Sequence, residues 1–413
     1  MTTDRAAARS GLPETADAEL RAADRPIGLY VHVPFCLRKC GYCDFNSYPG
    51  LHPALAVDYL RAVGREALSY LEGSYGPVRP GPVSDRPMAS VFFGGGTPTV
   101  LSGEALADGL RFILKNFQVA PGAETSVEAN PGTVDEAKLR RLAEAGFNRL
   151  SLGVQAFQDR LLERIGRVHR SAEVVRSVDA ARAAGFRNLN LDLIFGLPGQ
   201  TIADWRQSLE RAVALCPEHI AAYSLKVEKG TPFHAEQEQG TLELPSEDEE
   251  LEMYDLTVEI LRAAGYEHYE ISNFARPGRR SVHNQIYWRD EEYLGLGAGA
   301  HSSLSGTRWR NVAAPREYIA RLEAGKSPAE EIEHLTRAQE MSETAFMGLR
   351  MLQGLTKRRF EERFGVSLDE VYGHEIRRLR AEDLLEDTGE TIRLTDRGLR
   401  LGNRVFEAFI RPV

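Results

Sequence analysis

Short apolar segments alternate with helical patterns through the first half of the chain. Strands are expected at residues 28–35, 89–93, 124–129, 149–155, 188–195 and 219–226. Helices are expected between them at 54–72, 103–116, 134–145, 171–184 and 201–215. Connections of this length predict an α/β fold of parallel strands, apolar nearly throughout because both faces of the sheet are covered. A closed or partly closed barrel and a doubly wound sheet both fit, and in either the carboxyl ends of the strands carry the chemistry.

The chain changes character after the sixth strand. The acidic segment 246–252 starts a helix, and residues 266–304 are rich in Tyr, Gly and His. Helical patterns at 337–352, 357–364 and 367–380 then precede the hairpin-like stretch LLEDTGETIRLTDRG, which together are typical of a winged-helix module. We therefore expect a flexible N-terminal extension, a barrel, a barrel extension or connecting region and a small C-terminal winged-helix-like domain, at 1–25, 26–265, 266–334 and 335–413.

Composition excludes several classes of function. The net charge of −9, from 60 acidic and 51 basic residues, weighs against nucleic acid as a partner. No apolar run approaches the roughly 18 residues that cross a bilayer, and residues 1–25 lack the apolar core of a secretion signal. The expectation is a cytoplasmic protein with at most peripheral membrane association.

Four cysteines are too few for a disulfide framework, and Cys216, isolated in the sequence, is expected to be a small buried residue.

The other three cysteines form a cluster directly after the first strand. Cys36, Cys40 and Cys43 have the spacing C-x3-C-x2-C. Three thiolates can hold three irons of a [4Fe–4S] cluster, which leaves the fourth iron open to chelate the amino and carboxylate groups of S-adenosylmethionine (SAM). The alternative is a zinc site, which would need a fourth ligand such as His32 or Asp44 and lacks the second C-x2-C pair of most zinc loops.

A glycine-rich turn and several polar residues follow the later strands. The turn GGGTPT (94–99) would let backbone N–H groups approach a carboxylate or phosphate, and GLPGQT (196–201) is a second such turn. Arg167 could offset a carboxylate in the same cavity. Polar side chains expected at strand ends, facing one cavity, are Glu128, Gln155 and Asp192.

Six segments together resemble the oxygen-independent coproporphyrinogen III oxidase-like radical SAM family: YVHVPFCLRKCGYCDF, FFGGGTPT, EANPGT, SLGVQAFQ, IGRVHR and DLIFGLPGQT. The resemblance spans roughly 28–405 and implies a partial (β/α)6 radical SAM barrel with a winged-helix-like C-terminal domain. It implies a [4Fe–4S] cluster on the three clustered cysteines. It also implies SAM contacts from Tyr30, Tyr42, Gly95, Gly96, Thr97 and Glu128, with Gln155, Arg167 and Asp192 at further SAM-site positions.

Within this family the sequence is more similar to a haem chaperone branch than to the oxidases. The oxidases carry a fourth cysteine where this chain has Phe45, and their porphyrinogen-binding N-terminal extension has no counterpart here. CDFNSY, YEISNFA (269–275) and HNQIYW (283–288) match the chaperone branch. This resemblance implies a carrier that passes haem to acceptors such as respiratory cytochromes, with a reductant such as flavodoxin or ferredoxin. The alternative is an enzyme in which a SAM-derived radical abstracts hydrogen from a propionate side chain of coproporphyrinogen III, followed by two oxidative decarboxylations to protoporphyrinogen IX.

Haem needs an axial ligand, most often His, and an apolar face for its ring. His283 with Tyr287 and Trp288 offers both, and the resemblance favours it; His301, in GAGAHSS, is a second candidate. In the alternative interpretation, His283 and Asn284 order a loop over the SAM cavity while Tyr287 and Trp288 fill the core.

Overall fold

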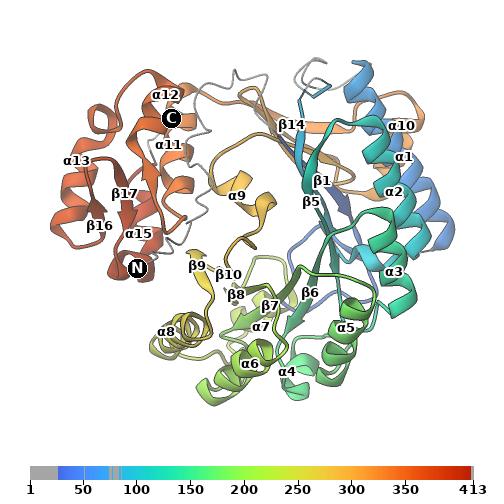
Figure 1. The fold of residues 1–413 in the computed structure, drawn as a ribbon, viewed down its shortest axis with the longest axis horizontal. Helices are drawn as coiled ribbons and strands as arrows, with labels where there is room; N and C mark the ends of the chain where they lie inside the picture. The colour runs from blue at the N-terminus through green and yellow to red at the C-terminus, as the bar shows by residue number, and fades with distance from the viewer. Residues whose placement is uncertain (1–26, 51, 74–76, 78–82, 85, 411–413) are drawn as a thin grey trace, which may run out of the picture.

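The structure, a computed structural model, describes residues 27–50, 52–73, 77, 83, 84 and 86–410. The extension predicted at 1–25 lies outside this part of the chain. Figure 1 shows a curved sheet with helices along its outer side and a second, smaller group of elements at the C-terminal end of the chain. Among the described helices, none combines the length and hydropathy that crossing a bilayer requires.

The described residues form one twelve-stranded sheet whose central strands follow one another in chain order. These parallel strands are β1 (Ile27–Val33), β4 (Met88–Gly95), β5 (Val119–Ala129), β6 (Arg149–Gln155), β7 (Leu189–Phe195) and β8 (His219–Ser224). A doubly wound sheet would reverse its strand order at a switch point, so that alternative is wrong. The curved, sequentially wound sheet is the partial (β/α)6 barrel.

Both edges of the barrel sheet are extended by the region after the sixth parallel strand. β11 (Tyr293–Leu296) pairs in parallel with β1, and antiparallel strands continue that edge. These are β12 (His301–Leu304), β13 (Thr307–Asn311) and β14 (Ala329–His334). On the opposite edge, antiparallel strands β10 (Asn273–Ala275) and β9 (Glu267–Glu270) follow β8. Strands from residues 267–334 therefore complete both edges of the sheet.

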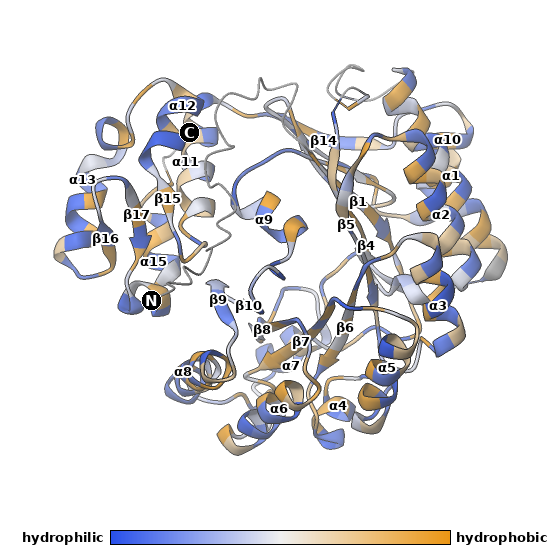
Figure 2. Ribbon diagram, viewed as in Figure 1, coloured by the Kyte–Doolittle hydropathy of each residue, from blue (hydrophilic) through white to orange (hydrophobic). Residues whose placement is uncertain are grey.

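Helices cover the outer side of the sheet, where polar and apolar residues are mixed along each helix (Figure 2). They are α1 (Pro53–Glu72), α2 (Gly103–Asn116), α3 (Glu136–Ala145), α5 (Ser171–Ala183), α6 (Ile202–Ala214), α8 (Glu247–Ala263) and α10 (Pro315–Glu323). The short helices α4 (Asp159–Arg164) and α7 (Pro232–Glu238) instead pack in a separate apolar cluster with Tyr42 and Ile194. The starts of the outer helices follow local capping: Thr201 and Asp204 form a capping box before α6, and Ser246 and Glu249 form one before α8. The short helix α9 (Val282–Trp288) instead packs on the inner side, against β1 and β4.

The barrel strands are buried on both faces, but the expectation of nearly continuous apolar residues is wrong. Leucines and valines face the helices and form the main hydrophobic core. The residues between them point inward and are polar, among them Ser126, Ser151, Asn190 and Asp192. The interior of the barrel is therefore a polar cavity wall.

Cys216 differs from its expected buried position. It follows α6 in the left-handed backbone region, with φ of 49°, and its side chain is exposed. The backbone reversal after the helix turns the thiol away from the core.

A buried carboxylate ties the first helix to the edge of the sheet. Glu66 of α1 accepts hydrogen bonds from the N–H of Gly297 at 2.8 Å, from Asn311 Nδ2 at 2.6 Å and from the hydroxyl of Tyr318. Burial raises the pKa of Glu66 to about 7, although these three donors lower it. The link fixes the segment that carries β11, β12 and β13.

This carboxylate predicts a pH dependence of stability. The folded state binds more protons than the unfolded state between the ordinary pKa of 4.5 and about 7. The contribution of Glu66 is therefore fully present below pH 4.5 and is lost as the pH rises through 7, an expected decrease of about 3 kcal/mol in the free energy of unfolding. Urea unfolding of wild type and Glu66→Gln at pH 5 and pH 8 measures the difference between the two proteins. If the free energy of unfolding changed equally with pH in both proteins, the raised pKa of Glu66 would be contradicted.

The C-terminal elements have a hydrophobic core of their own. They comprise α11 (Arg337–Gly348), β15 (Leu355–Thr356), α12 (Lys357–Phe364), α13 (Leu368–Ala381), β16 (Leu385–Asp387), β17 (Thr391–Leu394), α14 (Asp396–Arg400) and α15 (Gly402–Glu407). Three helices followed by the β16–β17 hairpin match the expected winged-helix outline, with α11 ending four residues earlier than the sequence predicts. Arg363 of α12 pairs with Asp290 at 2.9 Å, which links this module to the end of α9.

Candidate functional site

The clustered cysteines lie on a loop framed by β2 (Phe35–Cys36) and β3 (Tyr48–Pro49), at the carboxyl end of β1. Cys36 and Cys40 are buried, and Cys43 is half-buried. The loop is held to the rest of the barrel because the N–H of Gly41 donates to Ile165 O at 3.1 Å. The three thiols therefore share one fixed loop beside the polar interior.

Neighbouring side chains direct polar groups at two of these sulfurs. Burial raises the pKa of the Cys36 thiol, while the Thr97 hydroxyl, 3.6 Å from its Sγ, lowers it. Arg167 Nη1 donates to Cys40 Sγ at 3.7 Å. A hydroxyl and a guanidinium aimed at sulfur suit bound thiolates, which need compensating donors when they are buried.

The geometry does not support the zinc alternative. No three His, Cys, Asp or Glu side chains in the described residues converge as ligands of one metal ion. His32 is unsuited as the fourth ligand, since its Nε2–H donates to Asn46 O at 2.8 Å and its Nδ1 accepts from the Tyr30 hydroxyl at 3.1 Å. A cluster has a different requirement, because each thiolate binds its own iron.

The glycine turn that follows β4 is packed too closely against its neighbours to have room for side chains at Gly95 and Gly96. A Cβ at Gly95 would lie 2.4 Å from the His32 ring, and one at Gly96 would lie 2.6 Å from Phe35 O. Their N–H groups are already used: Gly95 donates to Glu128 Oε2 at 3.1 Å and Gly96 to Val33 O at 2.9 Å. The expectation that these N–H groups would be free for a ligand is therefore wrong. The turn instead lets three strands meet closely around the cysteine loop.

Two carboxylates lie in the barrel interior near this turn. Burial and then the charge of Asp192 raise the pKa of Glu128 to about 8, although the hydrogen bond from the N–H of Gly95 lowers it. Asp192 accepts hydrogen bonds from Ser151 Oγ at 2.8 Å and Asn190 Nδ2 at 2.9 Å. Within the described residues, no lysine or arginine pairs with Glu128. Burial raises the pKa of Asp192 overall, although Arg149 and Arg167 lower it. A pair of buried acids in which Glu128 has no cationic partner among the described residues suits a cationic ligand.

Several buried polar atoms in this region have no partner within the protein. They include Gln155 Oε1, Arg167 Nε and Ser126 Oγ. Gln155 also has a φ of 67°, which is unusual for a residue with a side chain. Buried polar groups normally have a partner, so orphaned atoms in one cavity indicate a site for a polar ligand or ordered water.

Sequence reasoning missed some members of the site. Asn130 joins two of the predicted residues: its Nδ2 donates to Thr97 Oγ1 at 2.9 Å, and its Oδ1 accepts from Arg167 Nη2. Ser151 and Asn190, which orient Asp192, were also missed. Polar residues at every second position within the strands were the signal that could have found them.

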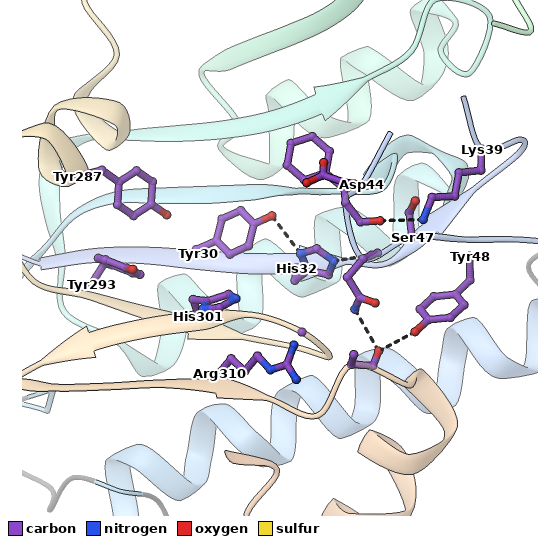
Figure 3. Close-up of a pocket in the computed structure, with 14 residues that line it drawn as sticks. Tyr30, His32, Lys39, Asp44, Ser47, Tyr48, Tyr287, Tyr293, His301 and Arg310 are labelled. Carbon is purple, nitrogen blue, oxygen red and sulfur yellow. Dashed lines mark hydrogen bonds between the residues drawn. The ribbon is translucent and has the colours of Figure 1, made fainter. Parts of the chain in front are cut away.

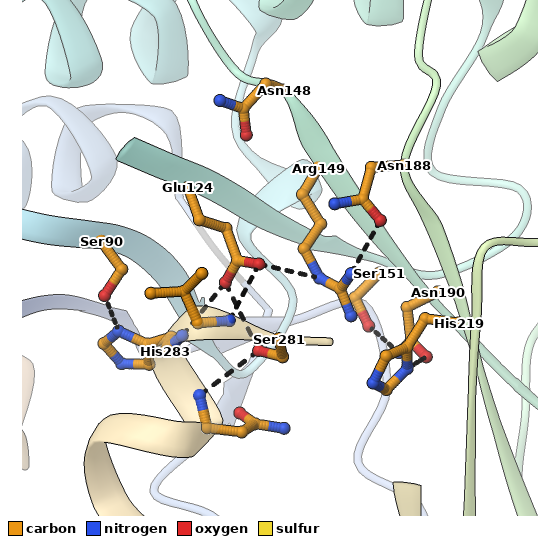
Figure 4. A network of polar contacts seen from close by, with 12 residues as sticks. Ser90, Glu124, Asn148, Arg149, Ser151, Asn188, Asn190, His219, Ser281 and His283 are labelled. Atoms are coloured by element: carbon orange, nitrogen blue, oxygen red, sulfur yellow. Dashed lines mark hydrogen bonds and ion pairs between the residues drawn. The ribbon is translucent and has the colours of Figure 1, made fainter. Parts of the chain in front are cut away.

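His283 lies in a closed network inside the barrel (Figure 4). Its Nδ1 bonds with Ser90 Oγ at 2.8 Å and its Nε2 with the Tyr287 hydroxyl at 2.9 Å. The side chain is 1% exposed, and burial lowers its pKa to about 3. Both ring nitrogens are therefore engaged, which favours an ordering role for His283 over the predicted role as haem ligand. Trp288 is half-buried: it packs against a small buried cluster of Tyr269, Ala275 and Met351, and the Arg350 guanidinium lies 4.2 Å from its ring.

Glu124 anchors the helix that carries His283. It accepts hydrogen bonds from the N–H groups of Val282 at 3.1 Å and His283 at 3.2 Å, at the start of α9. Arg149 lies 3.8 Å from the same carboxylate. These contacts hold α9 against the inner wall of the sheet (Figure 4).

Comparison with known proteins agrees with this geometry. Residues 30–212 match the family model of the radical SAM superfamily, and residues 335–401 match that of the HemN C-terminal domain. Coproporphyrinogen III oxidase (HemN) from Escherichia coli has the same fold, with a TM-score of 0.80 over 94% of this chain and 90% of that one, at 24% identity. The barrel and its cysteine loop define a radical SAM protein.

Proteins of similar sequence show to which family within the radical SAM class this chain belongs. Heme chaperone HemW of Bacillus subtilis (strain 168) is 40% identical over 92% of this chain and 98% of its own length. Heme chaperone HemW of Escherichia coli (strain K12) is 36% identical over 68% of this chain and 71% of its own. The chain belongs to the HemW family of heme chaperones.

Proposed function

We propose that this protein carries haem as cargo and delivers it to haem-free acceptors such as respiratory cytochromes, while holding a [4Fe–4S] cluster and SAM. The main support for this proposal is that Phe45 occupies the position at which the related oxidases have a fourth cysteine. Its side chain is 63% exposed and lines a cavity beside the cysteine loop. A phenyl ring can neither ligate iron nor transfer a proton, but it can pack against a flat apolar ligand.

The residues of the site fit the two resident groups. Cys36, Cys40 and Cys43 would hold the cluster, with Thr97 and Arg167 directed at two of the sulfurs. When bound, the cluster and SAM together would supply one-electron chemistry. Residues proposed to contact SAM are Tyr30, Tyr42, Gly95, Gly96, Thr97, Glu128, Gln155, Arg167 and Asp192.

The acidic pair supports a cationic ligand most directly. SAM carries a sulfonium and an ammonium group, whereas Glu128 and Asp192 lie buried close enough for one charge to raise the pKa of the other. The unpartnered Gln155 Oε1 can accept a hydrogen bond, and Arg167 Nε can donate one to a carboxylate. These chain atoms would orient SAM rather than react with it.

Glu128→Ala is therefore expected to weaken SAM binding by about 10- to 100-fold, since hydrogen bonds to charged groups contribute about 1.5–3 kcal/mol. Isothermal titration of SAM into the anaerobically reconstituted protein measures the change. Glu144→Ala, on the exposed face of α3, is the matched control and should leave affinity unchanged. Equal SAM affinity in wild type and Glu128→Ala would remove Glu128 from the site.

Delivery is tested by mixing the haem-loaded protein with the haem-free form of a b-type respiratory cytochrome subunit. The proposal predicts that the absorption spectrum of the reduced cytochrome develops faster than with the same concentration of free haem bound to albumin. The comparison is made with and without SAM. Haem that remains on the protein, or reaches the cytochrome no faster than from albumin, would contradict the proposal.

A further inference from the structure

A cavity of about 650 Å³ lies between the cysteine loop and the edge strands β11–β13. Figure 3 shows Tyr30 and His32 of β1 on one wall, with His301 of β12 and Arg310 of β13 beside them. Its volume is in the range of sites that bind ligands of cofactor size. His32 also packs against the glycine turn, since a Cβ at Gly95 would meet its ring. The cavity therefore adjoins the proposed SAM site and shares Tyr30 with it.

His301 is the histidine available to a ligand in this region. Both ring nitrogens of His32 are engaged, by Tyr30 and Asn46, and both of His283 are engaged, by Ser90 and Tyr287. The imidazole of His301 is exposed and makes no hydrogen bond to the described residues. Partial desolvation by the cavity walls, and then the charge of Arg310, lower the pKa of His301, so the ring is neutral at pH 7. Neutral imidazole is the form that binds iron.

Aromatic side chains supply apolar area around this imidazole. Tyr287 and Tyr293, whose rings contact edge to face at 4.6 Å, line one side. Phe45 and Tyr48 of the cysteine loop line another side and are 63% and 38% exposed. Large exposed aromatic rings at the mouth of a cavity are typical of a binding surface. A flat macrocycle would cover them.

Two cations lie in the same cavity. Lys39 is exposed, and its Nζ donates to Phe45 O at 3.1 Å. Arg310 Nη2 bonds with Glu331 at 2.7 Å and with Glu330 at 3.4 Å, but its Nε is buried without a partner. An orphaned guanidinium N–H indicates an acceptor that the protein itself does not supply. Asp44 is the acidic residue of the cavity lining and limits its positive charge.

We propose that this cavity is the haem site, with His301 as the axial ligand and with Lys39 and Arg310 receiving the two propionates. The inference rests on the proposed function, because it identifies where the cargo binds. His283 then serves to hold α9 and Tyr287 in place. Because Tyr30 and His32 separate this cavity from the glycine turn, haem and SAM would bind on neighbouring surfaces of β1.

The test uses ferric haem titrated into the full-length, anaerobically reconstituted protein, followed by the Soret band. We expect His301→Ala to shift or lose this band and to raise the dissociation constant at least about tenfold. Added imidazole should restore the wild-type band position, because it replaces the missing ligand. His374→Ala, an exposed histidine on α13, is the matched control and should bind haem as wild type does.

The possible outcomes separate this inference from the proposed function. An unchanged band and affinity in His301→Ala, with wild type binding one haem, would overturn the assignment of His301 and leave the chaperone proposal standing. A shifted band in His283→Ala with an unchanged one in His301→Ala would return the ligand to α9 and overturn the inference. Wild-type protein that binds no haem would overturn the proposed function itself. Arg310→Gln is expected to weaken affinity without moving the band, since it contacts a propionate and not the iron.

Discussion

Cys40→Ser is expected to leave the protein without its iron–sulfur cluster, the largest effect of any single substitution considered. Two remaining thiolates cannot hold a cubane cluster, and the seryl oxygen is a poor replacement for the sulfur that Arg167 approaches at 3.7 Å. Iron and acid-labile sulfide should fall to background after anaerobic reconstitution. The charge-transfer absorption of the cluster should disappear with them.

Cys216→Ser provides the matched control, because Cys216 is exposed and lies after α6, away from the cysteine loop. Its iron and sulfide content should equal that of wild type. A full cluster signal in Cys40→Ser would refute the ligand assignment. Loss of iron in Cys216→Ser would show that the assay reports general damage to cysteine mutants.

The second large effect is expected for Gly96→Ala. The new Cβ would lie 2.6 Å from Phe35 O and 2.9 Å from Phe35 N, both backbone atoms that cannot rotate away. Relief requires displacement of the segment that leads into Cys36. Overpacking of this kind should lower the free energy of unfolding by about 1–3 kcal/mol. It should also reduce SAM affinity at least about tenfold, because the turn and the cysteine loop move together.

Gly64→Ala is the corresponding control within helix α1. There the nearest side-chain atom to the new Cβ is 3.7 Å away, on Phe112. Alanine is the better helix former, so this variant should be as stable as wild type or more stable by up to about 1 kcal/mol. Urea unfolding and SAM titration of both variants give the comparison. Wild-type SAM affinity in Gly96→Ala would show that close packing at the turn is unimportant for the site.

Local patterns predicted much of the barrel. Helix α2 begins and ends at the predicted residues, and the strands from β4 to β8 lie within a few residues of their expected positions. These elements are long and strongly apolar on one side, which makes periodicity a reliable guide. The strands between 266 and 334 were not predicted individually, because they are short and gain their stability from pairing with distant strands such as β1.

Within the candidate site, residue types were easier to predict than their contacts. Glu128, Gln155, Arg167 and Asp192 were identified from the sequence, and contacts or neighbouring charges link Arg167 to the cysteine loop and Glu128 to Asp192. The use of the Gly96 N–H by Val33 O depends on the register of two strands, which no local pattern reveals.

The histidines show the same limit. His283 is flanked by aromatic residues in the sequence, which made it attractive as a haem ligand. Its two nitrogens are taken by Ser90, from a strand far away in the chain, and by Tyr287, one helical turn later. The free imidazole of His301 depends on its position on an edge hairpin beside the cysteine loop. Whether a histidine nitrogen is free or hydrogen-bonded therefore depends on the tertiary structure and cannot be predicted from the neighbouring sequence.

As proposed above, the protein carries haem and does not decarboxylate a porphyrinogen. The most direct measurement supplies the reconstituted protein with coproporphyrinogen III, SAM and a reductant, and supplies a second portion of the same sample with ferric haem. We expect stoichiometric haem binding and no conversion above the Cys40→Ser background. Formation of protoporphyrinogen IX above that background, without haem binding, would contradict the proposal and identify the protein as an oxidase.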